Sequence, residues 1–446
     1  MSHSRRSFIV NASLLAAGNL LGFRPFGMLN ALAQSSPSYK ALVCVFMFGG
    51  NDANNMLIPF DTTGYNNYAG IRGPLALPQN TLLQLAPQPN FALHPSMPEL
   101  QGLFNSGNAA FLANVGTLLQ PTTKAQYQGN QVAPPSNLFS HPDQQLEWQN
   151  QMADSSGSTG WAGRIADRLT TQYNPGALVP MIASISGDTL FCNGTETSPV
   201  SVGSGGPGTP SCSDNAYCSS RQTTAQQLSN FSSGVSLVQD DNGITNNAFT
   251  YNTVLADAFA SAPPLMTVFP ATPLGAQLNE VARIMQVRSA LGVTRQIFFV
   301  SVGNFDTHSA QLATQSTLLA EVSPALAAFY QALGELSLAN QVTAFTCSDF
   351  ARTFQPNSAD GSDHAWGSHH IILGGAVKGG QIYGTFPTLA LGGPDDVGSN
   401  GRWIPSTASA QYASTLAQWF GLTAADLPYV LPYIGNFSSN NLGFLG

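Results

Sequence analysis

The sequence predicts an α/β fold built around a mostly parallel sheet. Residues 41–48 are eight consecutive apolar residues, rich in Val and Phe, that end at Gly49-Gly50. Such a run is typical of a strand buried on both faces of a parallel sheet. Residues 296–302 and 341–346 are further strand-like runs, separated by a helical pattern at 310–338. Because ligands bind beyond the carboxyl ends of strands in such sheets, the loops after these runs are candidate site segments.

Length and composition limit the classes of protein. A chain of 446 residues suits two or three domains on length alone, but we expect one elaborated α/β domain with insertions. Only 9% of residues are charged, and there are 43 Gly and 29 Pro, which indicates a loop-rich protein. With 15 Lys and Arg and a net charge of −8, no basic stripe is available to neutralise phosphates, so a nucleic acid partner is excluded.

The first 33 residues have the pattern of an export signal. Residues 4–9 (SRRSFI) match the twin-arginine motif, an apolar run follows at 12–23, and 31–33 form a small-residue cleavage site. A membrane anchor is the alternative, but polar residues and a glycine interrupt the short run. We expect removal of 1–33 to leave a periplasmic or extracellular chain with no membrane span, and we assign residues 34–446 to a single domain.

The first half of the mature chain gives an ordered series of elements. Residues 98–104 have a short helical pattern, 109–115 are strand-like, and 160–169 form an amphipathic helical pattern. His94 directly precedes a proline. It is either a site residue or, more commonly for a histidine before a helix, a residue whose ring bonds the backbone.

Residues 186–250 differ from the rest of the chain. The segment is rich in Ser, Thr, Asn and Gln, and its centre, 203–210, consists almost entirely of Gly, Ser and Pro. This composition cannot bury a core of its own, so we predict a surface insertion or lid. A helical pattern with one apolar face returns at 278–291.

Five cysteines are too few for a disulfide scaffold. Cys44 and Cys347 lie in apolar strand-like runs, which predicts buried thiols. Cys192, Cys212 and Cys218 lie in polar sequence where a bridge is conceivable. Cys212 with Cys218 is the favoured pair.

Two candidate site residues lie in the first half of the chain. Asp52 follows the first strand, where its carboxylate can bind a cation or merely cap a helix. Ser140 precedes a helical pattern with Pro142 in its first turn. A hydroxyl there lies at the positive end of the helix dipole, which favours anion binding and nucleophile activation. His141 is then either the adjacent proton acceptor or a metal ligand or a residue that supports one. The alternative is a plain capping box formed by Ser140 and Asp143.

The carboxyl half supplies more acidic and imidazole side chains at strand ends. Asp306 and His308 follow the strand at 296–302, and Asp349 follows the strand at 341–346. Carboxylates hold hard cations and neutral imidazoles suit zinc or manganese, so the combination predicts a divalent-metal hydrolytic site. Each residue also has an ordinary alternative: Asp306 can cap a helix, and Arg352 can pair with Asp349.

Histidines are concentrated in these loops. Residues 360–370 carry three of the chain's seven histidines shortly before an apolar run. His364 is the metal candidate among them, whereas His369 or His370 can simply start a strand.

Six short motifs carry a resemblance to a known family. They span nearly the whole mature chain, at residues 48–55, 140–148, 160–161, 305–308, 348–353 and 363–367. With these motifs the chain resembles the family called domain of unknown function 1501, exported bacterial proteins distantly similar to the alkaline phosphatase and sulfatase superfamily.

The superfamily resemblance implies a three-layer α/β/α sandwich and a two-metal site. The metal ligands that it implies are Asp52, Asp306, His308, Asp349 and His364. Ser140 is the matching hydroxyl. The chain departs from the superfamily pattern in the short gap between Asp306 and His308 and in having Phe350 where a histidine usually follows the later Asp. It also has no Cys-x-Pro-x-Arg motif, which argues against a formylglycine nucleophile.

Together these features predict an exported hydrolase of phosphate or sulfate esters that depends on a divalent metal: Zn, Mn, Ca or Mg. Ser140, His141 and Arg352 are the expected catalytic residues, with either the Ser140 hydroxyl or water as the attacking group. The expected partner is a small anionic ester or an envelope glycan. The alternative is a non-catalytic cell-envelope protein that keeps the fold and binds a glycan or another protein.

Overall fold

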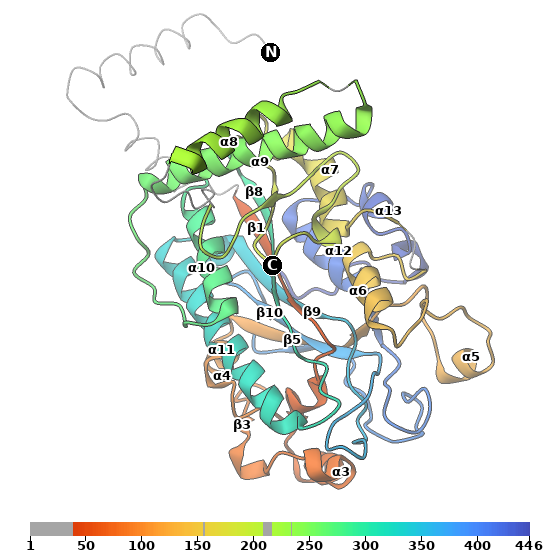
Figure 1. Ribbon diagram of the computed structural model, residues 1–446. Helices are drawn as coiled ribbons and strands as arrows, with labels where there is room; N and C mark the ends of the chain where they lie inside the picture. The colour runs from red at the N-terminus through yellow and green to blue at the C-terminus, as the bar shows by residue number, and fades with distance from the viewer. Residues whose placement is uncertain (1–38, 155–156, 208–215, 233) are drawn as a thin grey trace, which may run out of the picture.

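The computed structural model describes residues 39–154, 157–207, 216–232 and 234–446 (Figure 1). The predicted signal segment at 1–33 lies outside the described residues. So do the side chains of the predicted Cys212–Cys218 pair. Within the described part of the chain, no helix is both long and apolar enough to cross a membrane.

A large mixed sheet forms the centre of the molecule. Its strands run in the order β11-β5-β10-β9-β1-β8-β6-β7, and the short β12 pairs with β5. Only β10 is antiparallel to its neighbours, so the predicted mostly parallel sheet is confirmed. The strands of this sheet are β1 (Lys40–Met47), β5 (Ala109–Gly116), β6 (Ile182–Ser184), β7 (Val200–Ser201), β8 (Arg295–Val302), β9 (Val342–Ser348), β10 (Ser368–Leu373), β11 (Ile382–Gly384) and β12 (Thr407–Ala408).

Strand β1 lies in the middle of this sheet, as its continuous apolar sequence predicts. It pairs in parallel with β8 on one side and β9 on the other. Alternate side chains of β1 point to opposite faces, with Val43 and Val45 in one buried cluster and Leu42 and Cys44 in another. A strand with helices on both faces must be apolar throughout, and this explains the uninterrupted run.

Helices cover both faces of the sheet (Figure 1). One layer contains α4, α10 and α11, and the other contains α6, α7, α12 and α13. The helices are α3 (Thr62–Arg72), α4 (Pro98–Asn105), α5 (Lys124–Gln128), α6 (His141–Asn150), α7 (Trp161–Tyr173), α8 (Ala216–Ser229), α9 (Ser236–Ala260), α10 (Pro273–Gln286), α11 (Gln311–Glu335), α12 (Ser409–Phe420) and α13 (Leu427–Val430). The two helical layers and the sheet form the predicted α/β/α sandwich.

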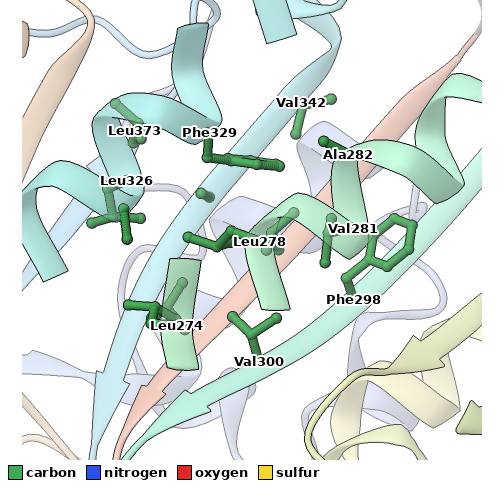
Figure 2. Packing of buried hydrophobic residues seen from close by; sticks show 14 of the residues in the cluster. Leu274, Leu278, Val281, Ala282, Phe298, Val300, Leu326, Phe329, Val342 and Leu373 are labelled. Carbon is green, nitrogen blue, oxygen red and sulfur yellow. The ribbon is translucent and has the colours of Figure 1, made fainter. Parts of the chain in front are cut away.

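Packing between α10, α11 and the sheet shows how one layer is held. Leu278 and Val281 of α10 lie over Phe298 of β8, and Phe329 of α11 lies beside them (Figure 2). All four side chains are almost completely buried. Burying a side chain of this size contributes about 1.5–3 kcal/mol, so these contacts fix the helices on the sheet.

Residues 186–250 differ from the predicted insertion in two ways. First, Phe191 and Cys192 are buried beneath the sheet, and β7 pairs with β6, so part of the segment belongs to the main core. The apolar runs there are at most three residues long, and no periodic pattern marks them. Second, the remainder includes α8 and most of α9, which pack against each other. Most of their described side chains are exposed.

The remaining elements are short and lie in loops of the sandwich. Strands β2 (Leu57–Pro59), β3 (Leu83–Gln84) and β4 (Phe91–Leu93) form a separate small sheet. Single 3-10 turns complete the chain at η1 (Ala53–Asn55), η2 (Gly73–Leu75), η3 (Gln79–Thr81), η4 (Leu190–Cys192), η5 (Ala339–Gln341) and η6 (Ile434–Asn436). The small sheet and α3 occupy the stretch between β1 and α4, which the sequence marks only as irregular.

Candidate metal centre

Three strands of the large sheet end at the same level. Met47 of β1 is in register with Val302 of β8 and with Ser348 of β9. The loops that follow these strands therefore begin side by side at one edge of the sheet. They carry Asp52, Asp306 and Asp349, as the sequence predicts.

Two glycines let the first of these loops pack against the second and third. Gly49 has a φ of +111°, and a Cβ there would lie 2.5 Å from the backbone nitrogen of Asp306. Gly50 has a φ of +80°, and a Cβ would lie 2.6 Å from the ring of Phe350. Any other residue would combine backbone strain with a clash, so the glycine pair sets the close approach on which the site depends.

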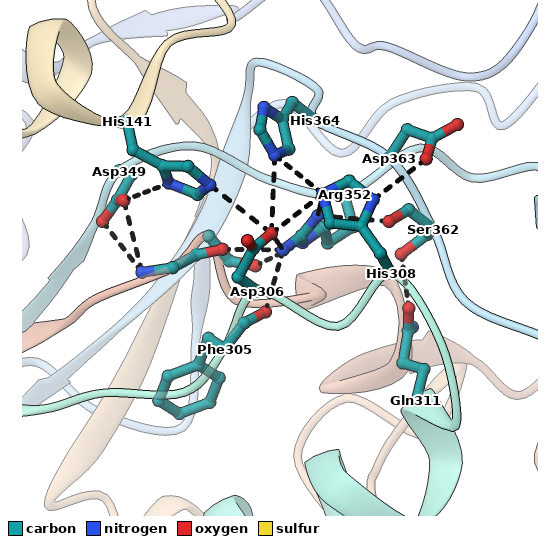
Figure 3. A network of polar contacts seen from close by, with 12 residues as sticks. His141, Phe305, Asp306, His308, Gln311, Asp349, Arg352, Ser362, Asp363 and His364 are labelled. Carbon is teal, nitrogen blue, oxygen red and sulfur yellow. Dashed lines mark hydrogen bonds and ion pairs between the residues drawn. The ribbon is translucent and has the colours of Figure 1, made fainter.

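Three imidazoles converge on one carboxylate oxygen (Figure 3). Oδ1 of Asp306 lies 3.4 Å from Nε2 of His141, 3.0 Å from Nε2 of His308 and 3.4 Å from Nε2 of His364. The ligand atoms of His141, Asp306 and His364 all lie within 4.8 Å of one another, which is a geometry that can hold a metal ion. The histidines come from α6 and from the loops after β8 and β9.

An oxygen atom holds the other nitrogen of each ring. Nδ1 of His141 lies 2.7 Å from Oδ2 of Asp349, and Nδ1 of His308 lies 3.1 Å from Oδ1 of Asp363. Nδ1 of His364 lies 2.7 Å from the carbonyl oxygen of Phe139. Carboxylate and carbonyl oxygens only accept, so each Nδ1 carries the proton and donates it. In the neutral rings, each Nε2 is therefore left as a lone-pair donor, which is the arrangement found around protein-bound zinc.

Two of these lone-pair nitrogens lie too close to be stable alone. Nε2 of His308 and Nε2 of His364 are 2.9 Å apart. Two lone pairs at this distance repel, so a proton or a metal cation has to lie between them. Nε2 of His141 is buried and has no hydrogen bond within the described part of the chain. A cation beside Oδ1 of Asp306 would satisfy all three nitrogens.

Several of the distances match the spacing of metal ligands. Zinc binds imidazole nitrogen and carboxylate oxygen at about 2.0–2.2 Å, so tetrahedral ligand atoms lie about 3.3 Å apart. Oδ1 of Asp306 lies 3.0–3.4 Å from the three Nε2 atoms, and the Nε2 atoms of His308 and His364 lie 2.9 Å apart. The compact ligand group consists of His141, Asp306 and His364, and His308 lies at its edge. The donor set of three nitrogens and one oxygen suits zinc or manganese better than calcium or magnesium. The residues present therefore fit a divalent cation.

Local charges act differently on the site histidines. The hydrogen bond to Asp349 raises the pKa of His141 above its usual value, although burial opposes this. Burial lowers the pKa of His364. For Asp306, burial favours a higher pKa, but the Arg352 guanidinium outweighs it, so the pKa is lowered and the carboxylate stays charged. The ionised carboxylate of Asp306 therefore lies among the imidazole rings.

Arg352, an expected catalytic residue, is completely buried and holds the loops together. Its Nη2 contacts Oδ1 of Asp306 and the carbonyl oxygen of Gly49, and its Nε donates to the carbonyl oxygen of Gly50. Nη1 donates to the carbonyl oxygen of Ser362. The guanidinium donors are therefore taken up by the protein itself, and Arg352 pairs with Asp306 instead of with Asp349.

Asp52, an expected metal ligand, belongs to a different set of contacts. Its buried carboxylate pairs with the Arg72 guanidinium and accepts from Gln311, and it also caps η1 by accepting from the backbone N–H of Asn54. The capping alternative for Asp52 is therefore what the structure shows. No polar atom of Asp52 joins the ligand group within the described residues.

Asp349 supports a ligand and stands outside the ligand group. Besides His141, its carboxylate accepts from the backbone N–H of Gly49 and from Nε2 of Gln145. These bonds occupy its oxygens and fix the His141 ring. Of the expected ligands, the structure thus brings Asp306 and His364 together, places His308 in contact with both and puts Asp349 one step further out.

Ser140 precedes α6, as predicted, but its hydroxyl is turned to its own helix. Oγ donates to Oδ2 of Asp143 at 2.5 Å, and it makes no capping bond to the backbone. The alternative capping box is therefore not formed, and the role of Ser140 as the nucleophile stays a prediction. The adjacent His141, expected as a proton acceptor, points its Nε2 toward Asp306.

Three further histidines are buried away from the ligand group. His369 and His370 lie in β10, which confirms the strand alternative for this pair. His94 accepts a hydrogen bond from the backbone N–H of Ser96 on Nδ1, and burial lowers its pKa to about 4. The backbone-bonding alternative for His94 is thereby confirmed.

Asp363 is the functional residue that the sequence reasoning missed. It holds His308, and Asn357 donates to the same oxygen. Burial alone would raise the pKa of Asp363, but the hydrogen bonds from Asn357 and His308 lower it. Its position directly before His364 is the one available signal, because a carboxylate next to a ligand often serves a neighbouring ring.

Comparisons with known proteins place the chain in a family and give distant structural likenesses. The sequence model of a family described as "Protein of unknown function (DUF1501)" matches residues 39–399. No curated protein matches the chain. Several solved structures that it resembles share 9–10% identity and TM-scores below 0.4 with it, so they describe a remote likeness and nothing about its chemistry.

Three of these solved structures illustrate how remote the likeness is. The lipoteichoic acid synthase LtaP from Listeria monocytogenes has 9% identity and a TM-score of 0.37, with 88% of this chain and 74% of that chain covered. The PsFucS1 sulfatase from Pseudoalteromonas sp. has 10% identity and a TM-score of 0.36, with 90% and 73% covered. Ps i-CgsB in complex with k-i-k-neocarrahexaose has 10% identity and a TM-score of 0.32, with 89% and 76% covered.

Proposed function

We propose that this chain, which belongs to the DUF1501 family, is a metal-dependent hydrolase of phosphate or sulfate esters. One observation carries the proposal: the Nε2 atoms of His141, His308 and His364 converge on Oδ1 of Asp306, while an oxygen acceptor holds every Nδ1. Such prepared imidazoles cost little to reorganise when a cation binds. Zn, Mn, Ca and Mg are the candidates, and the three nitrogens favour Zn or Mn.

The chemistry divides between the cation and the chain. A divalent cation in this position acts as a Lewis acid on an ester oxygen and lowers the pKa of water. The chain keeps the rings oriented through Asp349, Asp363 and the Phe139 carbonyl. The side chains of Asp306 and His308 are 46% and 45% exposed, so a substrate can reach this face from solvent.

The charges and contacts favour one cation over the two of the superfamily pattern. Three carboxylates, those of Asp306, Asp349 and Asp363, surround the site, and two guanidinium groups, those of Arg352 and Arg402, lie beside it, which leaves an excess of one negative charge. This small excess favours one divalent cation over two. A second has no carboxylate available nearby, because Asp52 is already bound to Arg72 and Gln311.

Export is part of the proposal. Its support is the twin-arginine pattern at residues 4–9 and the cleavage site at 31–33. The mature chain, residues 34–446, would then act as one domain in the periplasm or outside the cell. Its substrate there would be a small anionic ester or an ester group on an envelope glycan.

A non-catalytic binding protein is the second candidate, and one contact favours it. The Arg352 guanidinium contacts Oδ1 of Asp306, the oxygen on which the imidazoles converge. If this cation satisfies the carboxylate fully, the histidines share a proton and no metal binds. Metal content therefore separates the two functions.

The test compares two histidine variants of the full-length chain purified from the export compartment. His364→Ala removes a proposed ligand, whereas His94→Ala removes a histidine that lies outside the site and serves as the matched control. We expect His94→Ala and the parent chain to retain about one Zn or Mn per chain and to hydrolyse 4-nitrophenyl phosphate or sulfate. His364→Ala should lose both properties and keep its fold by circular dichroism. A parent chain without stoichiometric metal would favour the binding protein.

A further inference from the structure

We infer that Arg402 is the specificity residue that binds the anionic group of the substrate. The inference rests on the proposed function and names the chemistry that the site selects: a phosphate or sulfate group, through its oxygens. Arg402 lies beyond the last matching motif of the family and has no role in the sequence prediction. Its place beside His364 suggests the role.

Two contacts fix the guanidinium next to the ligand group. Nε of Arg402 donates to the carbonyl oxygen of His364 at 2.9 Å. The guanidinium carbon lies 4.5 Å from the centre of the Phe139 ring, on which it stacks. The carbonyl oxygen of that same Phe139 accepts from Nδ1 of His364. Phe139 therefore contacts both Arg402 and the proposed metal ligand His364.

The loop that carries Arg402 is itself firmly held. The buried carboxylate of Asp396 accepts backbone N–H bonds from Gly392, Gly398, Gly401 and Arg402. From α5, Nζ of Lys124 donates to the carbonyl oxygens of Gly392, Gly393 and Gly398. The Asp396 carboxylate thus binds the N–H groups of the loop, and the Lys124 ammonium binds its carbonyl groups. Because the loop is already ordered, binding of a ligand to its side chains costs little conformational entropy.

The terminal nitrogens of Arg402 are available to a ligand. Within the described part of the chain, Nη1 and Nη2 have no acceptor, and the side chain is only partly buried. The two other arginines near the site differ in this respect. Arg352 donates to four carbonyl oxygens of the chain, and Arg72 pairs with Asp52 and donates to the carbonyls of Thr353 and Phe354.

The shape of the donor group matches the proposed ligand. The two Nη atoms of a guanidinium form parallel hydrogen bonds to two oxygens of a phosphate or sulfate. The Nε hydrogen bond and the stacking on Phe139 fix the plane in which the two Nη atoms of Arg402 lie. The site also needs a positive group at its rim, because Asp306 and Asp363 are both partly exposed carboxylates that repel an anion. Arg402 offsets that repulsion on the side of His364.

Binding of inorganic phosphate and sulfate to the zinc-loaded full chain tests the inference without needing turnover. Isothermal calorimetry should show the Kd for these anions rising 10–100-fold in Arg402→Gln, with a smaller rise in Arg402→Lys, because one charged bidentate contact contributes roughly that much. Zinc content should stay at the parent level in both variants. Arg168→Gln is the matched control, since Arg168 also stacks on an aromatic ring, that of Tyr429, and is exposed elsewhere on the surface.

Several results would overturn the inference. One is a Kd for Arg402→Gln equal to that of the parent or the Arg168 control, and another is a zinc-loaded parent chain that binds neither anion. If the chain hydrolyses aryl esters, Arg402→Gln should raise KM for the phosphate or sulfate ester and leave KM for neutral 4-nitrophenyl acetate unchanged. An equal change for both esters would assign Arg402 a structural role. A zinc-loaded parent chain that binds the anions through Arg402 but hydrolyses no ester would instead count against the proposed function alone.

Discussion

Two groups of histidines in this chain show how surroundings decide what a ring can do. His364 lies at the solvent-facing edge of the sheet, where a carbonyl holds its Nδ1 and its Nε2 faces Asp306. Six residues later, His370 is fully buried in β10 between the rings of Trp148 and Tyr412, with neither nitrogen bonded within the described residues. The difference is the oxygen acceptor, which turns an imidazole into a prepared ligand.

Acidity separates the buried pair most clearly from His141, whereas burial also lowers the pKa of His364. Burial lowers the pKa of both His369 and His370 to about 3, so these rings stay neutral inside the sheet. At the site, Asp349 raises the pKa of His141. His369 and His370 therefore serve as neutral packing residues, whereas the site histidines can accept a proton or a cation.

The largest expected effect comes from removing a ligand. His308→Ala should lower the affinity for zinc at least 100-fold, because the tetrahedral set loses one of four donors. The unfolding free energy of the metal-free chain should change by less than about 1 kcal/mol, since the ring is 45% exposed. A zinc titration and a urea melt measure the two quantities. Unchanged zinc affinity would remove His308 from the site.

The same truncation in the buried group should have the opposite outcome. His370→Ala leaves a cavity beside Trp148 and Tyr412, so we expect a loss of about 2–4 kcal/mol of unfolding free energy. Zinc binding by the folded fraction should remain at the parent affinity. Loss of zinc binding without loss of stability would break the contrast between the two groups.

A substitution one step outside the ligand group should have an intermediate effect. Asp349→Asn keeps the shape of the side chain but removes the negative charge that orients and polarises His141. Outer partners of this kind change metal affinity by about 10–100-fold. Competition with a zinc chelator measures it. If Asp349→Asn lowers the zinc affinity as far as His308→Ala does, Asp349 is instead a direct ligand.

The pH dependence of stability separates the groups by sign. His369 and His370 have folded-state pKa values of about 3, below the ordinary 6.5, so the unfolded chain takes up protons first. Their contribution to stability is complete above about pH 6.5 and is lost as the pH falls toward 3, by up to about 1.4 kcal/mol per pH unit for each ring. His141 in the metal-free chain acts in reverse, because its raised pKa stabilises the fold at low pH and this is lost as the pH rises.

Urea melts between pH 4 and 7 check this prediction. His370→Phe should flatten the acid side of the stability curve, since Phe keeps the ring packing and carries no proton. A His370→Phe chain with the same acid slope as the parent would show that other groups control it.

The smallest expected effect concerns Ser140. Its hydroxyl donates to Asp143 at a partly exposed position, so Ser140→Ala should change the unfolding free energy by about 1 kcal/mol or less. Zinc affinity should not change. Ester hydrolysis should also persist, with water as the attacking group. A loss of more than 100-fold in kcat with zinc retained would restore Ser140 as the nucleophile.

Much of the fold was predictable because the strands that surround the site are continuous apolar runs. The runs that became β1, β8 and β9, and the acidic residues after them, follow from local sequence. The short β6 and β7 do not, since each is only two or three residues long and no long apolar run marks it.

The site was predictable only in outline, because it depends on partners distant in sequence. Asp52 and Asp306 both follow buried strands. Asp52 forms a buried ion pair with Arg72, twenty positions along the chain, whereas Asp306 pairs with Arg352 and stays partly exposed. His141 was expected as a proton acceptor, and its place among the ligands depends on Asp349, which is 208 positions away. No local pattern records such pairings.

The position of a bound cation tests the central claim most directly. Crystals of the full-length mature chain grown with zinc should show a single anomalous-scattering peak at the zinc edge, about 2.0–2.2 Å from Oδ1 of Asp306 and from the Nε2 atoms of His141 and His364. His308 should be the fourth protein ligand. No peak at this position, with Arg352 and the three rings unchanged around Asp306, would contradict the account, as would a peak bound by Asp52.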